Sequence, residues 1–176
     1  LGQKLAEILP AGLTKYLYTT GGADANENAI KFARAYTGKY KILTRYRSYH
    51  GASYGAVSLT GDPRRLAWEP TVMPDVVHFL DPFQYRSTFH RNRPGISEEE
   101  FTQDYLLHLE EYVQYEGADT IAAIMIETVT GTNGIIIPPK GYMEGVREIC
   151  SRNGILMITD EVMSGFGRTG EWFAVN

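Results

Sequence analysis

Residues 121–127 read IAAIMIE, and residues 155–161 read ILMITDE. Both stretches are apolar runs that end in carboxylates. The first run, Ile121 to Ile126, has no polar residue at alternate positions, so the strand that it predicts would be buried on both faces. Strands of this kind belong to parallel sheets that are covered by helices. The second run predicts another buried strand, from Leu156 to Thr159.

The sequence around these runs alternates between strand-like and helix-like patterns. Further strands are predicted at 16–20, 41–45 and 76–80, and helices at 23–36, 52–59, 97–114 and 141–152. Residues 81–95 contain two prolines and three arginines and predict a long loop. This alternation indicates an α/β fold with a mostly parallel sheet and helices on both faces.

The ends of two helices have clear sequence signals. Ser97, followed by three glutamates, is typical of a helix start, and Gly38 is typical of a helix end. In the helix that Gly38 would end, the apolar side chains fall on one predicted stripe. These residues are Ala25, Ala29, Ile30, Phe32, Ala33 and Tyr36.

Composition excludes several classes of protein. The chain has 176 residues, of which 43% are hydrophobic and 22% charged, and its net charge is −4. An acidic balance argues against a nucleic-acid partner, and no apolar run approaches the roughly 20 residues that span a bilayer. The lone cysteine, Cys150, lies in a helical pattern and is expected to be a buried thiol. A chain without an internal disulfide is compatible with the cytoplasm, which we predict as its location.

Neither terminus has the usual marks of a complete protein. The first residue is Leu1 and not Met, and the last residues, GEWFAVN, end on apolar side chains. We therefore interpret the chain as an internal segment of a longer protein.

Four segments rich in glycine or polar residues follow predicted strands. They are TTGGADAN (19–26), RSYHGASYG (47–55), IETVTGTNG (126–134) and TDEVMSGFG (159–167). Ligands of open α/β sheets bind beyond the carboxyl ends of the strands. We therefore expect the four segments to form one ligand cleft.

Three of these segments suggest particular chemistry. Gly21 and Gly22 precede a helix, whose free N–H groups favour a phosphate, although a tight turn without a ligand has the same pattern. Asp160 ends a buried strand and needs a partner, such as a protonated heterocyclic nitrogen, a buried arginine or a metal. A purely structural ion pair is an equal alternative. Tyr49 and His50 offer an aromatic face and a titratable group, for ring stacking or for core packing.

Other phosphate and metal motifs are missing. The glycines match neither a P-loop nor the dinucleotide-binding fingerprint. The histidines, at 50, 78, 90 and 108, have no metal-ligand spacing, so we predict no metal site.

Taken together, the segments resemble the class III aminotransferases, a branch of the fold-type-I enzymes that use pyridoxal 5'-phosphate (PLP). The resemblance rests on four stretches in the family's order, namely TTGGADANENAIKFARAYTGKYKI (19–42), YHGASYGAVSLTG (49–61), IAAIMIETVTGTNGIIIPPKGY (121–142) and ILMITDEVMSGFGRTG (155–170). It implies the large domain of the fold-type-I PLP transferases, present here in part.

The resemblance also implies roles for individual residues. Gly22 and Ala23 match the pair whose N–H groups hold the PLP phosphate, and Tyr49 matches the aromatic residue that stacks on the pyridine ring. Asp160 matches the carboxylate that pairs with the protonated ring nitrogen, which keeps the cofactor an electron sink. Three further positions match residues near the cofactor: Val162 at the other ring face, Met163 near the phenolic oxygen, and Glu127.

Two positions depart from the family pattern. Many members that use glutamate and 2-oxoglutarate carry a glutamate where this chain has Thr132, and that glutamate pairs with an arginine that otherwise binds the substrate's carboxylate. Met163 replaces the commoner glutamine. The absence of that glutamate favours an ω-amino acid:pyruvate type. GTNGIIIPPKGY (131–142) and RYRSYHGASYGAVSLTGDPRR (45–65) look most similar to taurine:pyruvate aminotransferases.

The family's Schiff-base lysine lies beyond the last matching stretch, and no lysine of this chain matches it. We therefore expect residues 1–176 to be part of the PLP-binding large domain, without the N-terminal segment, the catalytic-lysine region or the C-terminal small domain. The expected activity of the intact protein is transamination between a small-molecule amino donor and a keto acid, in a homodimer. Alternatives are an aminomutase, a decarboxylase, or a non-catalytic module that binds a phosphate ligand.

Overall fold

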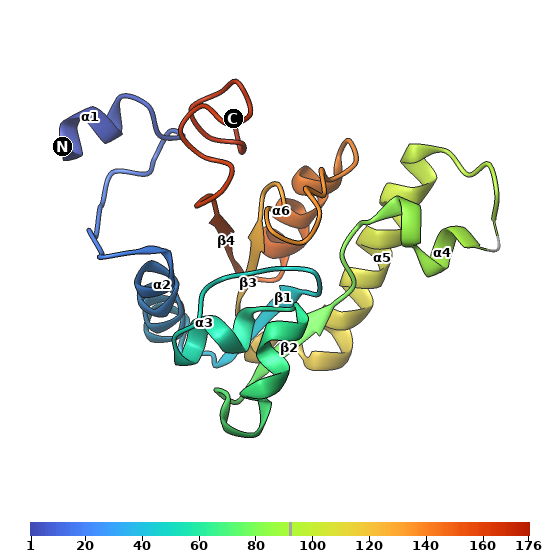
Figure 1. The fold of residues 1–176 in the computed structure, drawn as a ribbon, viewed down its shortest axis with the longest axis horizontal. Helices are drawn as coiled ribbons and strands as arrows, with labels where there is room; N and C mark the ends of the chain where they lie inside the picture. The colour runs from blue at the N-terminus through green and yellow to red at the C-terminus, as the bar shows by residue number, and fades with distance from the viewer. Residues whose placement is uncertain (92) are drawn as a thin grey trace.

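A four-stranded parallel sheet forms the centre of the computed structural model, which describes residues 1–91 and 93–176. The strands are β1 (Lys41–Arg45), β2 (Val76–Phe79), β3 (Ile121–Glu127) and β4 (Leu156–Asp160). They follow the order β2-β1-β3-β4, and each neighbouring pair is parallel (Figure 1). The predicted α/β fold with a parallel sheet is confirmed.

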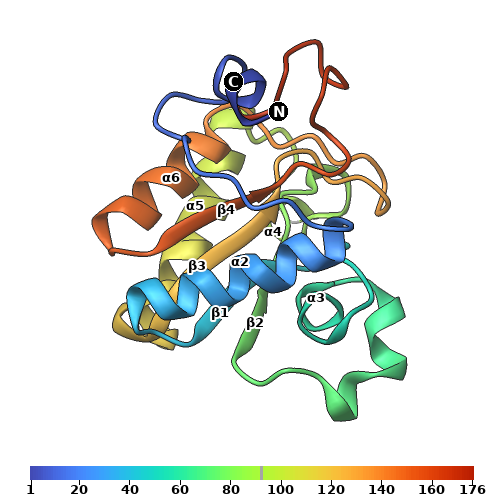
Figure 2. The same ribbon diagram turned by 90° about the vertical axis from the view of Figure 1, so that its left-hand side faces the viewer.

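Helices cover both faces of the sheet, as predicted (Figure 2). On one face lie α2 (Gly22–Thr37) and α3 (Tyr54–Leu59), and on the other lie α5 (Glu98–Glu116) and α6 (Tyr142–Arg152). Two shorter helices, α1 (Gly2–Ala6) and α4 (Thr88–Arg91), lie at the periphery. Short 3-10 turns occupy Pro63–Ala67, Glu69–Thr71, Gln84–Arg86 and Ala118–Thr120.

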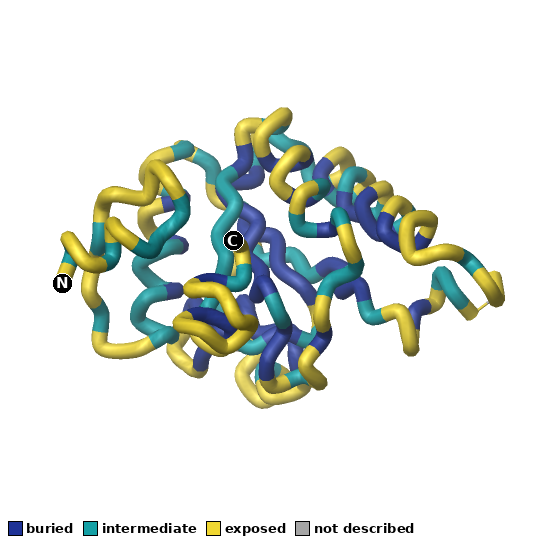
Figure 3. The backbone as a smooth tube through the Cα atoms, turned by 90° about the horizontal axis from the view of Figure 1, so that it is seen from above, coloured by how far each residue is buried: buried dark blue, intermediate teal, exposed yellow. Residues whose placement is uncertain are grey.

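Strand β3 is buried along its whole length, which explains its continuous apolar sequence. Ile124 and Ile126 belong to the core beneath α5 and α6. Ala123 and Met125 point the other way, into the core beneath α2 and α3. The sheet therefore separates two cores. Its two central strands, β1 and β3, are largely buried, whereas the edge strands β2 and β4 are mostly half-buried (Figure 3).

The two helix ends that the sequence indicated are present. The Ser97 hydroxyl accepts a hydrogen bond from the Glu100 N–H, and the Glu100 carboxylate accepts one from the Ser97 N–H. This capping box satisfies backbone donors at the start of α5. Gly38 ends α2 in the left-handed conformation, with φ of 69°.

Helix α3 takes its N-terminal cap from another helix. The Glu27 Oε1 atom of α2 accepts hydrogen bonds from the Ser53 hydroxyl at 2.6 Å, from the Gly55 N–H at 2.6 Å and from the Ala56 N–H at 3.1 Å. A helix of six residues is too short to be stable alone. The position of α3 therefore depends on α2.

Cys150 lies on the inner side of α6 and is buried, as expected. Burial raises the pKa of its thiol to about 11. The thiol is therefore protonated near neutral pH and acts as an apolar side chain of the core.

Two sequence predictions were wrong in detail. Residues 16–20 form no strand, and Leu17 and Tyr18 are each 57% exposed. Their residue types suit a strand, but among the described residues no strand pairs with this segment. The predicted loop at 81–95 contains a 3-10 turn and helix α4. Among the described residues, no helix is long and apolar enough to cross a membrane.

The apolar stripe of α2 is narrower than predicted. Ile30 and Ala33 are buried, whereas Phe32 and Tyr36 are exposed. The third buried residue of this helix is polar, Asn26. Tertiary packing therefore selects a face of α2 that includes an amide and excludes two aromatic rings.

Gly61 lies so close to the end of β1 that a side chain there would collide with the backbone. An added Cβ would meet the carbonyl oxygen of Arg45 and lie 2.7 Å from Tyr46 Cα. We expect Gly61→Ala to lower the free energy of unfolding by about 1–3 kcal/mol, measured by urea denaturation. Gly21→Ala is the control, because a Cβ there has no atom within 4 Å and φ is 179°. Equal stability of the two variants would contradict this prediction.

Candidate active site

The carboxyl ends of β1, β3 and β4 meet at one edge of the sheet, next to the start of α2. Glu127 and Asp160 are the last residues of β3 and β4 and lie side by side in the strand register. The Tyr49–His50 loop follows β1, and α2 begins at Gly22. This edge is where the sequence predicted a ligand cleft.

Asp160 is 7% exposed and is held by three hydrogen bonds. Its Oδ2 atom lies 2.8 Å from His50 Nδ1 and accepts a hydrogen bond of 2.9 Å from Asn26 Nδ2. Its Oδ1 atom accepts a hydrogen bond of 3.1 Å from the Val162 N–H. An ionised carboxylate only accepts hydrogen bonds, so we assign a proton to the Nδ1 atom of His50, which then donates to Asp160.

The same three contacts keep Asp160 ionised. Burial alone would raise the pKa of the carboxyl, but the hydrogen bonds from His50, Asn26 and Val162 outweigh burial and lower the pKa below its ordinary value of 3.8. A negative charge is therefore fixed at the end of β4 near neutral pH.

The start of α2 lies beside Asp160. Gly21 at the N-cap makes no side-chain hydrogen bond, so the first N–H groups of the helix depend on other acceptors. A Cβ on Gly22 would lie 2.9 Å from Val162 Cγ2. Gly51, with φ of +126°, lies close to Ala23, because a Cβ added to Gly51 would be only 2.6 Å from the Ala23 Cβ. The loops after β1 and β4 therefore both contact the first turn of α2.

Glu127 connects two of the loops. One carboxylate oxygen accepts a hydrogen bond of 3.0 Å from the Tyr49 N–H, and the other accepts one of 2.8 Å from the Gly131 N–H. The Glu127 side chain is buried. Gly131 in turn packs against Met163, because a Cβ on Gly131 would collide with Met163 Cγ. Glu127 therefore fixes the loops that carry Tyr49 and Thr132.

Arg64 joins the same two loops through its side chain. Its guanidinium carbon lies 4.0 Å from the centre of the Tyr49 ring, within the range of a cation–π contact. It pairs with Asp62 and donates a hydrogen bond of 3.1 Å to the Thr132 hydroxyl. A cation therefore lies beside Thr132.

All seven residues singled out from the sequence lie at this edge of the sheet: Gly22, Ala23, Tyr49, Glu127, Asp160, Val162 and Met163. Their roles toward a cofactor remain predictions. His50 does not offer its ring for stacking, because it is buried against Asp160. Sequence reasoning missed Asn26 and Arg64. The only available signal for Asn26 was a polar residue one turn before Ile30 on the buried stripe of α2.

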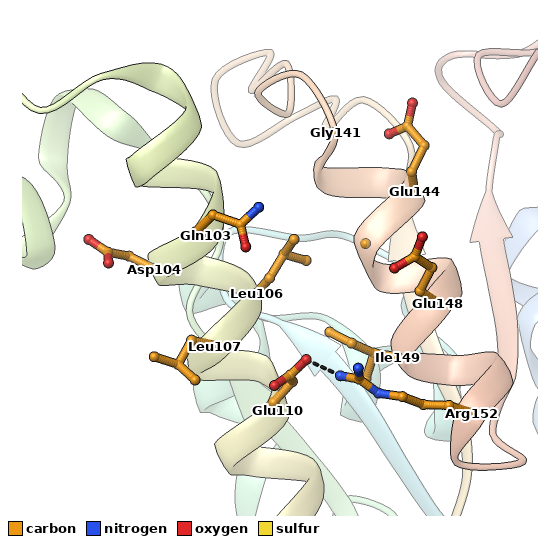
Figure 4. Close-up of a pocket in the computed structure, with 11 residues that line it drawn as sticks. Gln103, Asp104, Leu106, Leu107, Glu110, Gly141, Glu144, Glu148, Ile149 and Arg152 are labelled. Atoms are coloured by element: carbon orange, nitrogen blue, oxygen red, sulfur yellow. Dashed lines mark hydrogen bonds and ion pairs between the residues drawn. The ribbon is translucent and has the colours of Figure 1, made fainter.

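A groove between α5 and α6 lies on the other face of the sheet and has a volume of about 560 Å³ (Figure 4). Four carboxylates line it, from Asp104, Glu110, Glu144 and Glu148. Glu110 pairs with Arg152 across the groove. None of the seven residues predicted for the cofactor site lines this groove. Among the described residues, no group of three or more histidine, cysteine or carboxylate side chains is arranged to hold a metal ion.

Comparison with known proteins identifies the family. Residues 1–176 match the family described as Aminotransferase class-III, and the chain therefore belongs to it. A leucine/methionine racemase of Thermococcus litoralis is 40% identical, over 99% of this chain and 39% of its own. A hypotaurine/taurine–pyruvate aminotransferase of Paracoccus denitrificans is 39% identical, over 97% of this chain and 37% of its own.

A solved structure of similar fold is the taurine:2-oxoglutarate aminotransferase of Bifidobacterium kashiwanohense, in complex with PLP and glutamate. It superposes with a TM-score of 0.87 at 49% identity, over 98% of this chain and 39% of that one. The chain thus spans about two fifths of the length of the proteins that it matches.

The charge of Asp160 makes stability depend on pH. Folding lowers the pKa of Asp160, so its contribution to the free energy of unfolding is complete at pH values above its ordinary pKa of 3.8. This contribution is lost as the pH falls through the folded-state pKa. Asp160→Asn replaces an acceptor by an amide, so we expect a loss of about 1–3 kcal/mol at pH 7 that shrinks below about pH 4. Urea denaturation between pH 3 and 7 measures the difference. Asp119→Asn, at an exposed position, is the control, and a pH-independent loss for Asp160→Asn would refute the assignment.

Proposed function

We propose that the protein to which this chain belongs is a PLP-dependent aminotransferase that moves an amino group from an ω-amino acid or amine to a keto acid. The observation that carries this proposal is the ionised, buried carboxylate of Asp160 beside the uncapped start of a helix. A fixed negative charge and a cluster of free N–H groups suit the two ends of a pyridine ring that carries a phosphate. Membership of the family supports the same assignment.

The residues present fit PLP. Asp160 Oδ2 already accepts two hydrogen bonds, whereas Oδ1 accepts one and retains capacity for a protonated ring nitrogen. Gly22 and Ala23 would hold the phosphate through their N–H groups, and Tyr49 would stack on the ring. Val162 is 69% exposed beside Gly22, which suits an apolar contact to the other ring face.

Two more residues complete the proposed set. Met163, half exposed, would lie near the phenolic oxygen, and Glu127 would support the ring indirectly because it holds the Tyr49 loop. When bound, PLP supplies an electron sink for the substrate carbon. The part of this chain is to orient the ring and to keep its nitrogen protonated through the charge of Asp160.

Pyruvate is the proposed acceptor. Thr132 has no charge, so it cannot pair with the substrate-binding arginine as the glutamate of other members would. The arginine beside Thr132 in this structure, Arg64, pairs with Asp62 instead. The similar proteins include both acceptor types, because one is named for pyruvate and another for 2-oxoglutarate. The acceptor therefore has to be measured.

We further propose that residues 1–176 form part of the PLP-binding large domain of a cytoplasmic homodimer. The catalytic lysine would then lie outside this chain, because none of its lysines matches the family's position. The lone, buried Cys150 is compatible with a reducing compartment. A second candidate function is amino-acid racemisation, which the 40% identity to the Thermococcus litoralis racemase favours. The same cofactor residues would serve it.

The reaction and its acceptor can be tested together in the full-length protein. With taurine or β-alanine as donor, we expect faster turnover with pyruvate than with 2-oxoglutarate, measured as alanine or glutamate formed. A preference for 2-oxoglutarate would show that Thr132 does not decide the acceptor. Racemisation of leucine or methionine without transfer to a keto acid would favour the second candidate.

The role of Asp160 predicts a large effect on turnover. Asp160→Ala leaves the ring nitrogen without a counter-charge, so we expect kcat to fall by about 10²-fold or more. Asp119→Ala, which removes an exposed carboxylate, is the matched control and should keep the wild-type rate. Near-normal turnover of Asp160→Ala would rule out the proposed role of this carboxylate.

A further inference from the structure

Asn26 is a polar residue on the buried stripe of α2, and its side chain is almost fully removed from water, at 6% exposed. The other buried residues of this helix are Ile30 and Ala33. A buried amide costs free energy unless its donors are satisfied. The contacts of the amide should therefore explain why this stripe carries a polar residue.

The amide of Asn26 joins three separate elements. Its Nδ2 atom donates to the backbone oxygen of His50 at 2.8 Å and to Asp160 Oδ2 at 2.9 Å. Both hydrogens of one NH₂ group are therefore used, one on the loop after β1 and one at the end of β4. Asn26 itself lies one turn after Gly22 and Ala23, at the proposed phosphate site.

His50 supplies the second side-chain contact to Asp160. Its Nδ1 atom binds the same Oδ2 atom of Asp160, and its Nε2 atom lies 3.3 Å from the Thr44 hydroxyl. The His50 N–H also donates to the Thr60 hydroxyl at 3.0 Å, which fixes the loop. The two oxygens of Asp160 are therefore not equivalent, because Oδ2 has two donors and Oδ1 has only the Val162 N–H.

We propose that Asn26 is a positioning residue of the cofactor site, which sets the place and orientation of the Asp160 carboxylate relative to the start of α2 and to the Tyr49–His50 loop. With His50, it occupies Oδ2 and leaves Oδ1 as the oxygen that faces the cofactor. This inference rests on the proposed PLP function and deepens it. It assigns Asn26 no contact with the cofactor.

Asn26→Leu tests the proposal in the full-length protein. Leucine has nearly the shape of asparagine and suits the apolar stripe, but it removes both donors. Asn28→Leu is the matched control, because the Asn28 amide bonds only within α2, to the backbone and side-chain oxygens of Asp24. Both variants thus lose one amide from the same helix.

Three measurements distinguish positioning from a merely structural role: the dissociation constant of PLP, the ring-nitrogen chemical shift of ¹⁵N-labelled PLP, and the free energy of unfolding without cofactor. For Asn26→Leu we expect PLP to bind about 10- to 100-fold more weakly, as for the loss of a hydrogen bond to a charged group. We also expect the ¹⁵N shift to move toward that of the neutral ring. Asn28→Leu should change neither.

Each outcome decides a question. A folded Asn26→Leu protein with wild-type PLP affinity and ¹⁵N shift overturns the proposal and leaves the proposed function intact, and so does a loss of stability alone. If Asn26→Leu does not fold, Asn26→Ser is measured in the same way and judged by the same criteria. Failure of the wild-type protein to bind PLP would instead refute the proposed function, and this inference with it.

Discussion

Strand β3 has no side that faces water, and most of the architecture follows from this constraint. Its seven residues are buried, and its apolar side chains are shared between two different cores. Helices must therefore cover both faces, and parallel strands with crossover helices are the arrangement that achieves this. The carboxyl ends of neighbouring strands then lie together, and residues distant in the sequence become neighbours.

The same constraint places two buried carboxylates side by side, Glu127 on β3 and Asp160 on β4. The protein satisfies them in different ways. Glu127 uses both oxygens on backbone N–H groups of two loops, and it is thereby committed to holding these loops in place. Asp160 receives both of its side-chain donors on Oδ2, whereas Oδ1 has only a backbone donor and retains capacity for a ligand. Like residues at equivalent strand ends therefore support different tasks.

Sequence patterns predicted the features that depend on neighbours along the chain. The strands β3 and β4, the capping box at Ser97 and the end of α2 at Gly38 are of this kind. The predicted burial of β4 was wrong, because β4 lies at the edge of the sheet and Leu156 to Thr159 are only partly buried. The strand predicted at 16–20 was wrong because strands form only where a partner exists. Phe32 and Tyr36 are exposed because tertiary packing, and not the helix pattern, selects the buried face of α2.

The residues of the candidate site likewise include some that local sequence signals predicted and some that they did not. Glycines before a helix and carboxylates after apolar runs are local signals, and they led to Gly22, Glu127 and Asp160. Asn26 has only a weak local signal, a polar residue one turn before Ile30, because its partner Asp160 is 134 positions away in the sequence. Arg64 looks like a surface residue of a turn until the fold brings it over the Tyr49 ring.

The cap that Glu27 supplies to α3 has a consequence for the order of folding. Because three donors at the start of α3 converge on one oxygen of α2, the shorter helix gains its N-terminal stabilisation only after the longer one is in place. Opening of α2 should therefore also open α3, whereas α3 can open alone. Local unfolding that frees α3 would release the loop beside Tyr49, while α2 could lose its partner and remain helical.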